Sequence, residues 1–409
     1  MTASGRARRR TIGLLAATTL LAFVPALLGG FVYDSRIQIL TDPFLHDPAN
    51  WPAVLSGRVL GMDVLDFNRP AMLASLMLDA AVWGRQPFGY HLTSVILHVI
   101  NAVLVWLLLD RLGLSRDDRV VTPAVVGAIL FALHPIVTET VCEPSYREDL
   151  LVATFTLAAL VIALGPSPAE AVDAEARPAD GAVWRAAACI GCALLAVASK
   201  ESGIALPPLL VVTHACVARK GPRRFWWMAV GGATLVVVAF LAARFILEPA
   251  DSRIFGKPVP LGGSFPAALA IEPRILAFDA QLILWPFNQS ADYQLSSLDH
   301  LPLPRALLVL ALVVAALVWG AWRDRRIALA SALIILSILP VANLWPIFQP
   351  AADRYLYLPL VSVAMIVATI LERPWQPSGS LGQRWAMVGV LTVIAALGVA
   401  CVRRQAVWQ

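Results

Sequence analysis

The chain has 409 residues, of which 59% are apolar and only 14% are charged. Its repeated uncharged runs cannot be solvated by water, so this composition excludes a soluble protein of several domains and predicts transmembrane helices. The net charge of +5 does not indicate a nucleic-acid partner, because the basic residues lie in short segments between apolar runs.

The first apolar run follows an arginine-rich segment, residues 6–10, and continues without a charge from Thr11 to Tyr33. A cleaved signal peptide has a shorter apolar stretch of about 7–15 residues, so we predict an uncleaved first span. The whole chain, residues 1–409, is expected to be a single all-α polytopic membrane domain of about eleven transmembrane helices. The expected spans are 11–32, 91–109, 120–137, 150–166, 184–199, 203–218, 225–246, 306–322, 327–346, 355–371 and 385–402.

The distribution of Lys and Arg predicts the orientation of these spans. If the N-terminus is cytoplasmic, the two densest basic loops, 218–224 and 323–326, fall on the same side as the N-terminal arginines. Segment 167–183, rich in Ser, Pro, Ala, Glu and Asp, is then expected to be a disordered cytoplasmic loop.

Two long segments, 33–90 and 247–305, fall on the opposite, outer side. Within the first, Ala71–Trp83 is expected to form an amphipathic helix that lies on the membrane. Within the second, Ile275–Phe287 is apolar and carries Asp279, but it is too short to span. We therefore expect a re-entrant or interfacial helix there.

Charged residues gather at span ends on this outer face. Charges at the hydrocarbon boundary are costly and usually mark a pathway or a site. The turn Ser199–Ser202 contains a lysine and a glutamate, although Gly, Ser or Asn would join two apolar helices at lower cost. The full set of charged residues is Asp34, Arg69, Glu139, Glu143, Arg147, Glu148, Asp149, Lys200, Glu201, Asp353 and Arg354, and the polar Tyr355 follows Arg354.

Each member also has a simpler interpretation. Asp34 fits an ordinary helix end, Arg147 with Asp149 fits a local ion pair, and Asp353 with Arg354 fits an anchor at the lipid headgroups. The turn at 199–202 fits a polar interfacial turn. The pattern on one face is stronger evidence than any single residue.

The histidines and cysteines give weaker signals. His134, next to Pro135, fits a buried residue at a kink, and His91 fits packing or hydrogen bonding on a helix better than metal ligation. Cys189 and Cys192 lie inside an apolar helix, where small packing residues are expected.

Carboxylates and fixed cations at membrane depth suit an anionic, lipid-linked substrate. The cations would hold a phosphate, and a carboxylate would act as base on an incoming hydroxyl. This chemistry predicts a transferase with a lipid-phosphate donor. A flippase or transporter could line a cavity with the same charges, and a scaffold without catalysis also remains open.

Short motifs in a fixed order then point to a family. They are Phe31-Val32-Tyr33-Asp34, Asn68-Arg69-Pro70, the run from Pro87 to His98, Leu130–Ile136 with Glu139, Arg147–Leu151, Ser199–Gly203 and Asp353–Pro359. Together they resemble the membrane portion of the TMTC-type (transmembrane and tetratricopeptide repeat) O-mannosyltransferases, which belong to the C-type glycosyltransferase superfamily.

The resemblance implies a polyprenyl- or dolichyl-phosphate sugar, such as a mannose donor, and an acceptor hydroxyl such as Ser or Thr of a translocated protein. It implies that Asp34 is the catalytic base. Lys200, Arg147 and Arg354 become candidates for the donor phosphate. The remaining candidates for substrate contacts are Arg69, His91, His134, Glu139, Asp149, Glu201, Asp353 and Tyr355.

Two departures from the family pattern matter. The family often has a second acid beside the first, but Ser35 stands there, which weakens a paired-carboxylate model. A divalent metal is compatible with the scheme, although nothing in the spacing requires one. Relatives also continue into tetratricopeptide repeats near the point where this sequence ends, so independent action, a repeat partner and truncation stay open.

The composition, rich in Ala, Leu and Arg, indicates a bacterial source. We therefore expect the inner membrane, with the active site facing the periplasm.

Overall fold

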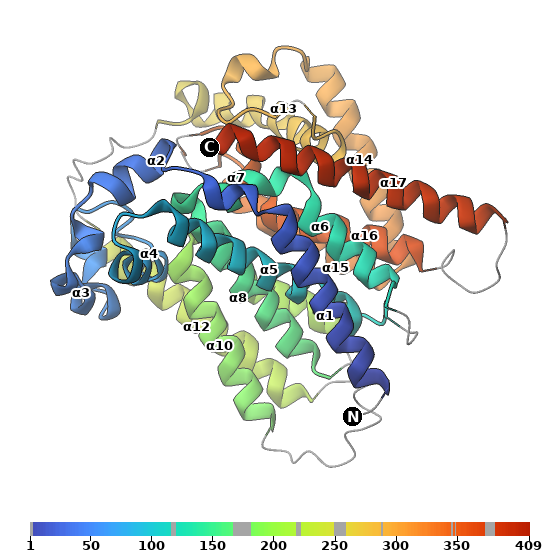
Figure 1. Ribbon diagram of the computed structural model, residues 1–409, viewed down its shortest axis with the longest axis horizontal. Coiled ribbons are helices and arrows are strands. Elements are labelled where there is room, and N and C mark those ends of the chain that lie inside the picture. Colours follow the sequence, from blue (N-terminus) through green and yellow to red (C-terminus); the bar gives the residue numbers. More distant parts are fainter. Residues whose placement is uncertain are drawn as a thin grey trace.

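The computed structural model describes residues 3–115, 120–166, 181–217, 222–248, 259–287, 289–344, 347, 349–372 and 381–409. Within these segments the secondary structure is helical throughout, with no strands (Figure 1). This agrees with the expected all-α class. The long apolar helices make the protein an integral membrane protein.

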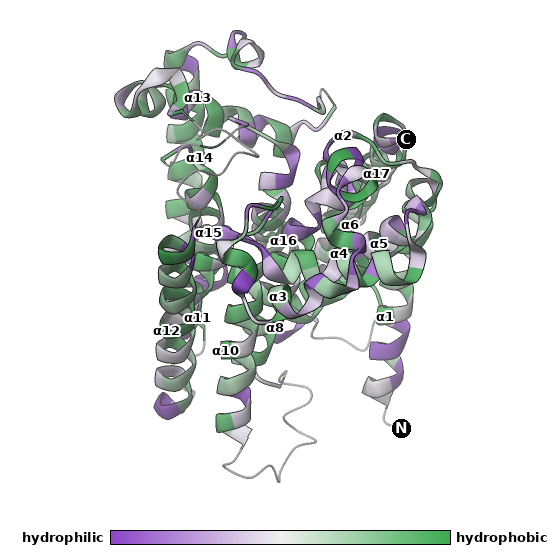
Figure 2. Cartoon of the chain, turned by 90° about the vertical axis from the view of Figure 1, so that its left-hand side faces the viewer, coloured by the Kyte–Doolittle hydropathy of each residue, from purple (hydrophilic) through white to green (hydrophobic). Residues whose placement is uncertain are grey.

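Six helices in the described segments are long and apolar enough to cross a membrane, and the number rises to eight if each of two bent pairs counts as one span. The six are α5 (Pro87–Arg111), α10 (Gly181–Ser199), α12 (Arg223–Leu247), α14 (Leu303–Arg323), α16 (Tyr357–Leu371) with its preceding turn, and α17 (Leu381–Arg404) with its following turn. Figure 2 shows hydrophobic residues along these helices and hydrophilic residues nearer their ends.

Both bent pairs have a proline at the break. Helix α1 (Ala3–Ala22) meets Pro25–Thr41 at 41°, and α6 (Pro123–Leu133) meets Pro135–Cys142 at 49°. Proline lacks the N–H that would continue the helical ladder and clashes with the preceding turn, so each helix is redirected at that residue. The second half of each pair carries expected site residues.

The expected number of eleven spans is not confirmed. The three other expected spans are helices α8 (Arg147–Leu164), α11 (Leu206–Cys216) and α15 (Arg325–Ile338). Helices α11 and α15 have only 11 and 14 residues, and α8 begins with three consecutive charged residues.

Helices α5, α6, α8 and α16 form the centre of the molecule, and α10 packs between α8 and α12. Their facing sides are apolar and buried in one continuous core. The charged first turn of α8 and the charged turn that precedes α16 (Asp353–Leu356) therefore sit on a rigid base at one end of this bundle.

Segment 33–90, which is expected on the outer side, folds into α2 (Tyr33–Ser35), a π-helical turn (Arg36–Thr41), α3 (Trp51–Leu55) and α4 (Pro70–Trp83). It has a small hydrophobic core of its own. The second outer segment contains α13 (Phe265–Leu284), which begins ten residues before the expected helix at 275–287. Its polar residues around Pro273 interrupt the apolar pattern, which hid the first half of the helix. Most of the expected disordered loop, residues 167–180, lies outside the described residues, and Gly181 begins α10.

The C-terminal end of α17 returns to the end of α1. In Figure 1 the last turn of the chain lies near α2 and α7. The Gln405 side chain donates to the Ala22 carbonyl oxygen (2.8 Å) and accepts from the Ala26 amide (3.1 Å). The first and last spans thus jointly position the segment that contains Asp34.

Candidate active site

Asp34 lies in the short helix α2, after the bend that follows α1. Its side chain is exposed, and no described residue pairs with its carboxylate. The preceding residue, Tyr33, has a φ of 44°, a left-handed conformation that bulky residues rarely adopt. The Tyr33 ring packs against Trp408, with centroids 5.6 Å apart. Such local strain is found where surrounding contacts fix a functional geometry.

Two of the expected cations share one aromatic ring. Lys200 Nζ lies 5.4 Å from the centroid of the Tyr355 ring, and the Arg354 guanidinium lies 5.0 Å from the same centroid. Arg354 also lies over Tyr146, at 4.0 Å. The structure therefore brings together the turn at 199–202 and the turn before α16, which are far apart in the sequence.

Each of these cations has a carboxylate partner. Lys200 Nζ donates to Asp149, and Arg354 donates to Glu139, which also accepts from the Arg354 amide at 3.0 Å. All four side chains are nearly buried, so the low local polarity strengthens these pairs. A phosphate at this position would compete with carboxylates for the same cations.

Asp34 lies near this row of cations and rings. The hydroxyl of Ser35, the residue after Asp34, accepts a hydrogen bond from the amide of Ser145, the residue before Tyr146, at 3.2 Å. Because Arg354 stacks on Tyr146, the candidate base and the candidate phosphate-binding cations border one region.

A second ionic cluster surrounds Glu201. Arg69 and Arg244 lie 3.5 and 3.1 Å from its carboxylate, and Arg69 also pairs with Asp66 at 2.7 Å. Burial alone would raise the pKa of Glu201, but the charges of Arg69 and Arg244 outweigh it and lower the pKa to about 2. This cluster ties the turn at 199–202 to the outer segment.

Asp353 is fully buried in a hydrogen-bonded pocket. It accepts from Gln289 Nε2 and from the Tyr293 hydroxyl, both at 2.8 Å, and Arg404 Nη2 lies 3.6 Å away. These contacts join the outer segment 247–305 to the ends of α16 and α17.

Arg147, a sequence candidate for the phosphate, lies in a separate buried pair. Its guanidinium is 2.6 Å from Asp79 and donates to the Tyr90 carbonyl oxygen at 2.9 Å. The side chain is fully buried. Its contacts hold α8 against α4 and α5, so we give it a structural role.

His91 and His134 also make backbone contacts. His91 Nε2 donates to the Gly30 carbonyl oxygen (3.2 Å), just before the Asp34 segment. His134 Nε2 donates to the Ile283 carbonyl oxygen (3.0 Å), and its Nδ1 accepts from the Ile136 amide. Both rings are buried. The His91 hydrogen bond therefore helps to hold the segment that leads to Asp34, whereas the His134 hydrogen bond links α6 to α13.

Sequence reasoning missed several members of these clusters. Arg244 and Arg404 lie at the expected outer ends of spans. Lys200 was selected because it is a charged residue at such an end, so the same criterion could have selected these two arginines. Asp66, Asp79 and Tyr146 had no such signal. Asp79 and Tyr146 pair with residues of distant segments, and Asp66 pairs with nearby Arg69 but does not lie at the end of an expected span.

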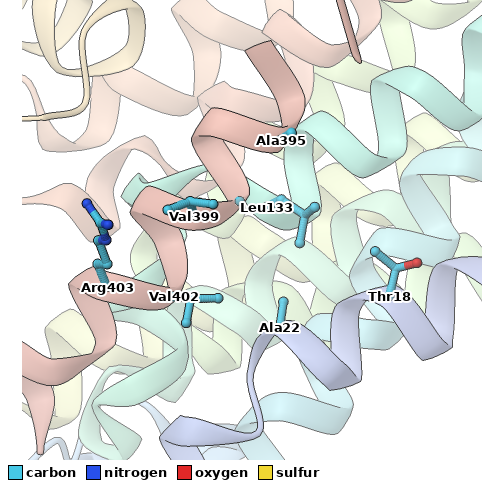
Figure 3. Close-up of a pocket in the computed structure, with 8 residues that line it drawn as sticks. Thr18, Ala22, Leu133, Ala395, Val399, Val402 and Arg403 are labelled. Carbon is cyan, nitrogen blue, oxygen red and sulfur yellow. The ribbon is translucent and has the colours of Figure 1, made fainter. Parts of the chain in front are cut away.

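In the part of the chain described by the structure, no group of three or more His, Cys, Asp or Glu residues is placed to hold a metal ion. A groove of about 470 Å³ lies between α1, α6 and α17 (Figure 3). It is lined mainly by small apolar residues, among them Ala22, Leu133 and Val399, and none of the carboxylates described above lines it.

The fold is similar to that of the oligosaccharyltransferase of Archaeoglobus fulgidus in its apo form. The TM-score is 0.51 at 12% sequence identity, over 97% of this chain and 56% of that one. The chain therefore shares the helical fold of that membrane enzyme, in agreement with the fold that the resemblance implied.

The sequence relatives are more specific, although no family model matches the chain. It is 23% identical over 385 residues to the protein O-mannosyl-transferase F38B6.6 of Caenorhabditis elegans, and 24% identical over 407 residues to TMTC3 of Homo sapiens. These matches cover 89% and 88% of this chain but only 51% and 42% of the relatives. The chain therefore resembles the TMTC-type O-mannosyltransferases along most of its length, and spans about half the length of these relatives.

Proposed function

We propose that this protein is an integral membrane glycosyltransferase that moves a sugar from a polyprenyl-phosphate donor to a hydroxyl acceptor. The observation that carries the proposal is the exposed carboxylate of Asp34 beside buried cations at the end of a membrane bundle. Similarity to protein O-mannosyltransferases supports mannose as the sugar and Ser or Thr of a protein as the acceptor.

In the proposed mechanism, Asp34 accepts the proton of the acceptor hydroxyl while that oxygen attacks the anomeric carbon. The bond from the anomeric carbon to the phosphate oxygen breaks, and the lipid phosphate leaves. Lys200 and Arg354 stabilise its charge, each partly exchanging its carboxylate partner for phosphate oxygens. A direct displacement of this kind inverts the anomeric centre, so a product that retains the donor configuration would contradict it.

We infer that Arg354 and Lys200, and not Arg147, contact the phosphate. Both stack on Tyr355, which is only partly buried, whereas Arg147 is enclosed with Asp79. The side chains around Glu201 would then shape the acceptor or sugar side of the site.

We further propose that the N-terminus is cytoplasmic and that the site faces the opposite side, which in a bacterial inner membrane is the periplasm. The basic loops on the N-terminal side support this orientation. We also propose that tetratricopeptide repeats, in this protein or in a partner, deliver the acceptor, as the resemblance to the TMTC-type proteins implies.

The test is sugar transfer in membranes that contain equal amounts of folded wild type, Asp34→Asn and Asp299→Asn. Asp299 is a matched control, because it is an exposed acid of the other outer segment. We expect transfer by the wild type and the control, and its loss in Asp34→Asn. Equal transfer by all three would remove Asp34 from its role. Absence of transfer by the wild type, across several polyprenyl-phosphate sugars and acceptors and with a tetratricopeptide protein added, would contradict the transferase and favour a flippase.

A further inference from the structure

The backbone around Asp34 is held in a conformation that it would not adopt alone. Tyr33 has a φ of 44°, which is unfavourable for a residue with a bulky side chain. The other two non-glycine residues with positive φ in the described segments, Asp66 and Asn343, are of types that tolerate this region. The segment must therefore be fixed by contacts from its neighbours.

One such contact comes from a buried carboxyl group with no cation beside it. Glu143, just after α7 (Thr138–Cys142), is completely buried. Its Oε1 accepts from the Ser35 amide (2.9 Å), from the Ser35 hydroxyl and from the Ser145 hydroxyl (2.7 Å). The Ser145 amide donates back to the Ser35 hydroxyl at 3.2 Å. Ser35, Glu143 and Ser145 thus form a closed hydrogen-bonded ring directly beside Asp34.

The distribution of these bonds shows what the carboxyl group holds. Oε2 of Glu143 is buried and has no hydrogen-bond partner, so every bond of the carboxyl group goes to Ser35 or Ser145. Burying a carboxyl without a cation is costly, and a neutral side chain could accept the same bonds at lower cost. The carboxyl group therefore acts here as the hydrogen-bond acceptor that joins Ser35 to Ser145.

Other contacts hold the same segment from the opposite side. Trp408 packs against Tyr33, and His91 donates to the carbonyl oxygen of Gly30. At Gly29 an added Cβ would lie 3.2–3.3 Å from the Ala26 oxygen, the His91 ring and the Trp408 oxygen, so the chain passes through a narrow space there. The residue before Asp34 is thus held by Trp408, and the residue after it is held by the Glu143 ring of hydrogen bonds.

We propose that Glu143 is a positioning residue for Asp34, which acts through Ser35 to fix the direction of the Asp34 carboxylate. The inference rests on the proposed function for its catalytic meaning. It also gives the Asp34 segment a second carboxyl group although residue 35 is a serine, because Glu143 supplies one from the end of α7. Burial raises the pKa of Glu143 to about 7, against the lowering effect of its hydrogen bonds from Ser145 and Ser35.

The experiment uses the full chain in membranes or detergent with Glu143→Leu, Glu143→Gln, Ser35→Ala and the double variant that combines Glu143→Leu with Ser35→Ala. The control is Glu272→Leu, since Glu272 is another buried acid with one unpaired oxygen, but it is bonded to Asn343, away from Asp34. Two quantities are measured: amide hydrogen exchange of the peptide that covers residues 31–37, and kcat and KM for the donor.

We expect Glu143→Leu to accelerate exchange at the Ser35 amide roughly tenfold, because the acceptor of that N–H is lost. We expect kcat to fall roughly 10- to 100-fold, with KM for the donor changed less than about twofold, because the base is misplaced while the phosphate contacts remain. Glu143→Gln should retain most of both properties. As a single variant, Ser35→Ala should lower kcat. Combined with Glu143→Leu, it should cause no further loss of kcat, since both substitutions remove the same contact.

If the rate of amide hydrogen exchange in residues 31–37 is unchanged in Glu143→Leu, the proposal is overturned, whatever the values of kcat and KM are. Additive losses from Glu143→Leu and Ser35→Ala would also overturn it, and so would an equal loss of kcat in Glu272→Leu. If Glu143→Leu does not fold, the exchange and kcat of Ser35→Ala and Glu143→Gln decide the question. If the wild type transfers no sugar but exchange rises as expected, the transferase proposal has failed and the hydrogen-bonded ring stands as a structural feature only.

Discussion

The guanidinium group of Arg354 lies close enough over the ring of Tyr146 to bring its carbon within 4.0 Å of the ring centroid. Tyr146 comes from the turn before α8, and Arg354 from the turn before α16. This contact joins the two outer turns that carry the acids and cations of the candidate site. It also keeps Arg354 directed toward the region that Asp34 borders.

The contact predicts that the ring of Tyr146, and not its hydroxyl, matters for donor binding. Tyr146→Leu should raise KM for the donor about 2- to 30-fold, since a desolvated cation–π contact contributes roughly 0.5–2 kcal/mol. Tyr146→Phe keeps the aromatic face and should behave like the wild type. Donor titrations of both variants test this, and equal KM values for the two variants would refute it.

We expect Arg147 to stabilise the folded protein. Arg147→Ala leaves the Asp79 carboxylate buried without its partner, and should destabilise the protein by about 3–5 kcal/mol. Replacing both partners, with Arg147→Met and Asp79→Leu, should recover much of that loss because no unpaired charge remains. Unfolding in detergent gives the stabilities. A double variant that is folded but no longer binds donor would instead return Arg147 to the phosphate site.

Gly203 should tolerate no side chain. An added Cβ would lie 2.5 Å from backbone atoms of Ala196 and Val197, which cannot move aside without shifting α10. Gly203→Ala should therefore lower the thermal unfolding temperature and disturb the adjacent Lys200 turn. Gly191→Ala, in the same helix α10 with open space around it, should be neutral or stabilising by up to about 1 kcal/mol. Similar unfolding temperatures for the two variants would contradict this account of the packing.

Glu143 predicts a pH dependence of stability with a definite sign. Its pKa rises from the ordinary 4.5 to about 7, chiefly through burial, so the folded protein holds this proton more tightly than the unfolded chain. The stability from this group is full below about pH 4.5 and is lost as the pH rises through about 7. The difference in unfolding temperature between wild type and Glu143→Gln should therefore fall between about pH 4 and 8. A difference that stays constant with pH would show that Glu143 does not titrate in this range.

Much of the site could be predicted from sequence because charges at the ends of apolar spans are rare and costly. That rule selected Lys200, Asp149, Arg354 and Glu139, and the structure joins them in two pairs. The rule predicts on which face of the membrane a charged residue lies, but not which residue it pairs with. It could not separate Arg147, which is enclosed by α4 and α5, from cations beside a partly exposed ring.

The remaining features depend on contacts between distant segments. Asp353 accepts hydrogen bonds from Gln289 and Tyr293, which follow helix α13 in the chain. The apolar pattern of α13 is interrupted around Pro273, so the sequence did not predict the whole helix. The role of Glu143 depends on a bond to Ser35, 108 residues away. Periodicity and span counting contain no information about such pairs, so sequence could give the bundle and its charged end but not the connections within it.

The closure of α17 onto α1 has a consequence for how the protein is made. Gln405 bonds to Ala26 across 379 residues, and Trp408 contacts the ring that precedes Asp34. Ribosomes deliver α1 to the membrane long before α17, so the Asp34 segment lacks these contacts until α17 has been made. A nascent chain would already carry the candidate base and its phosphate-binding cations. The Asp34 segment would reach the geometry described above only after α17 has been inserted and has packed against α1.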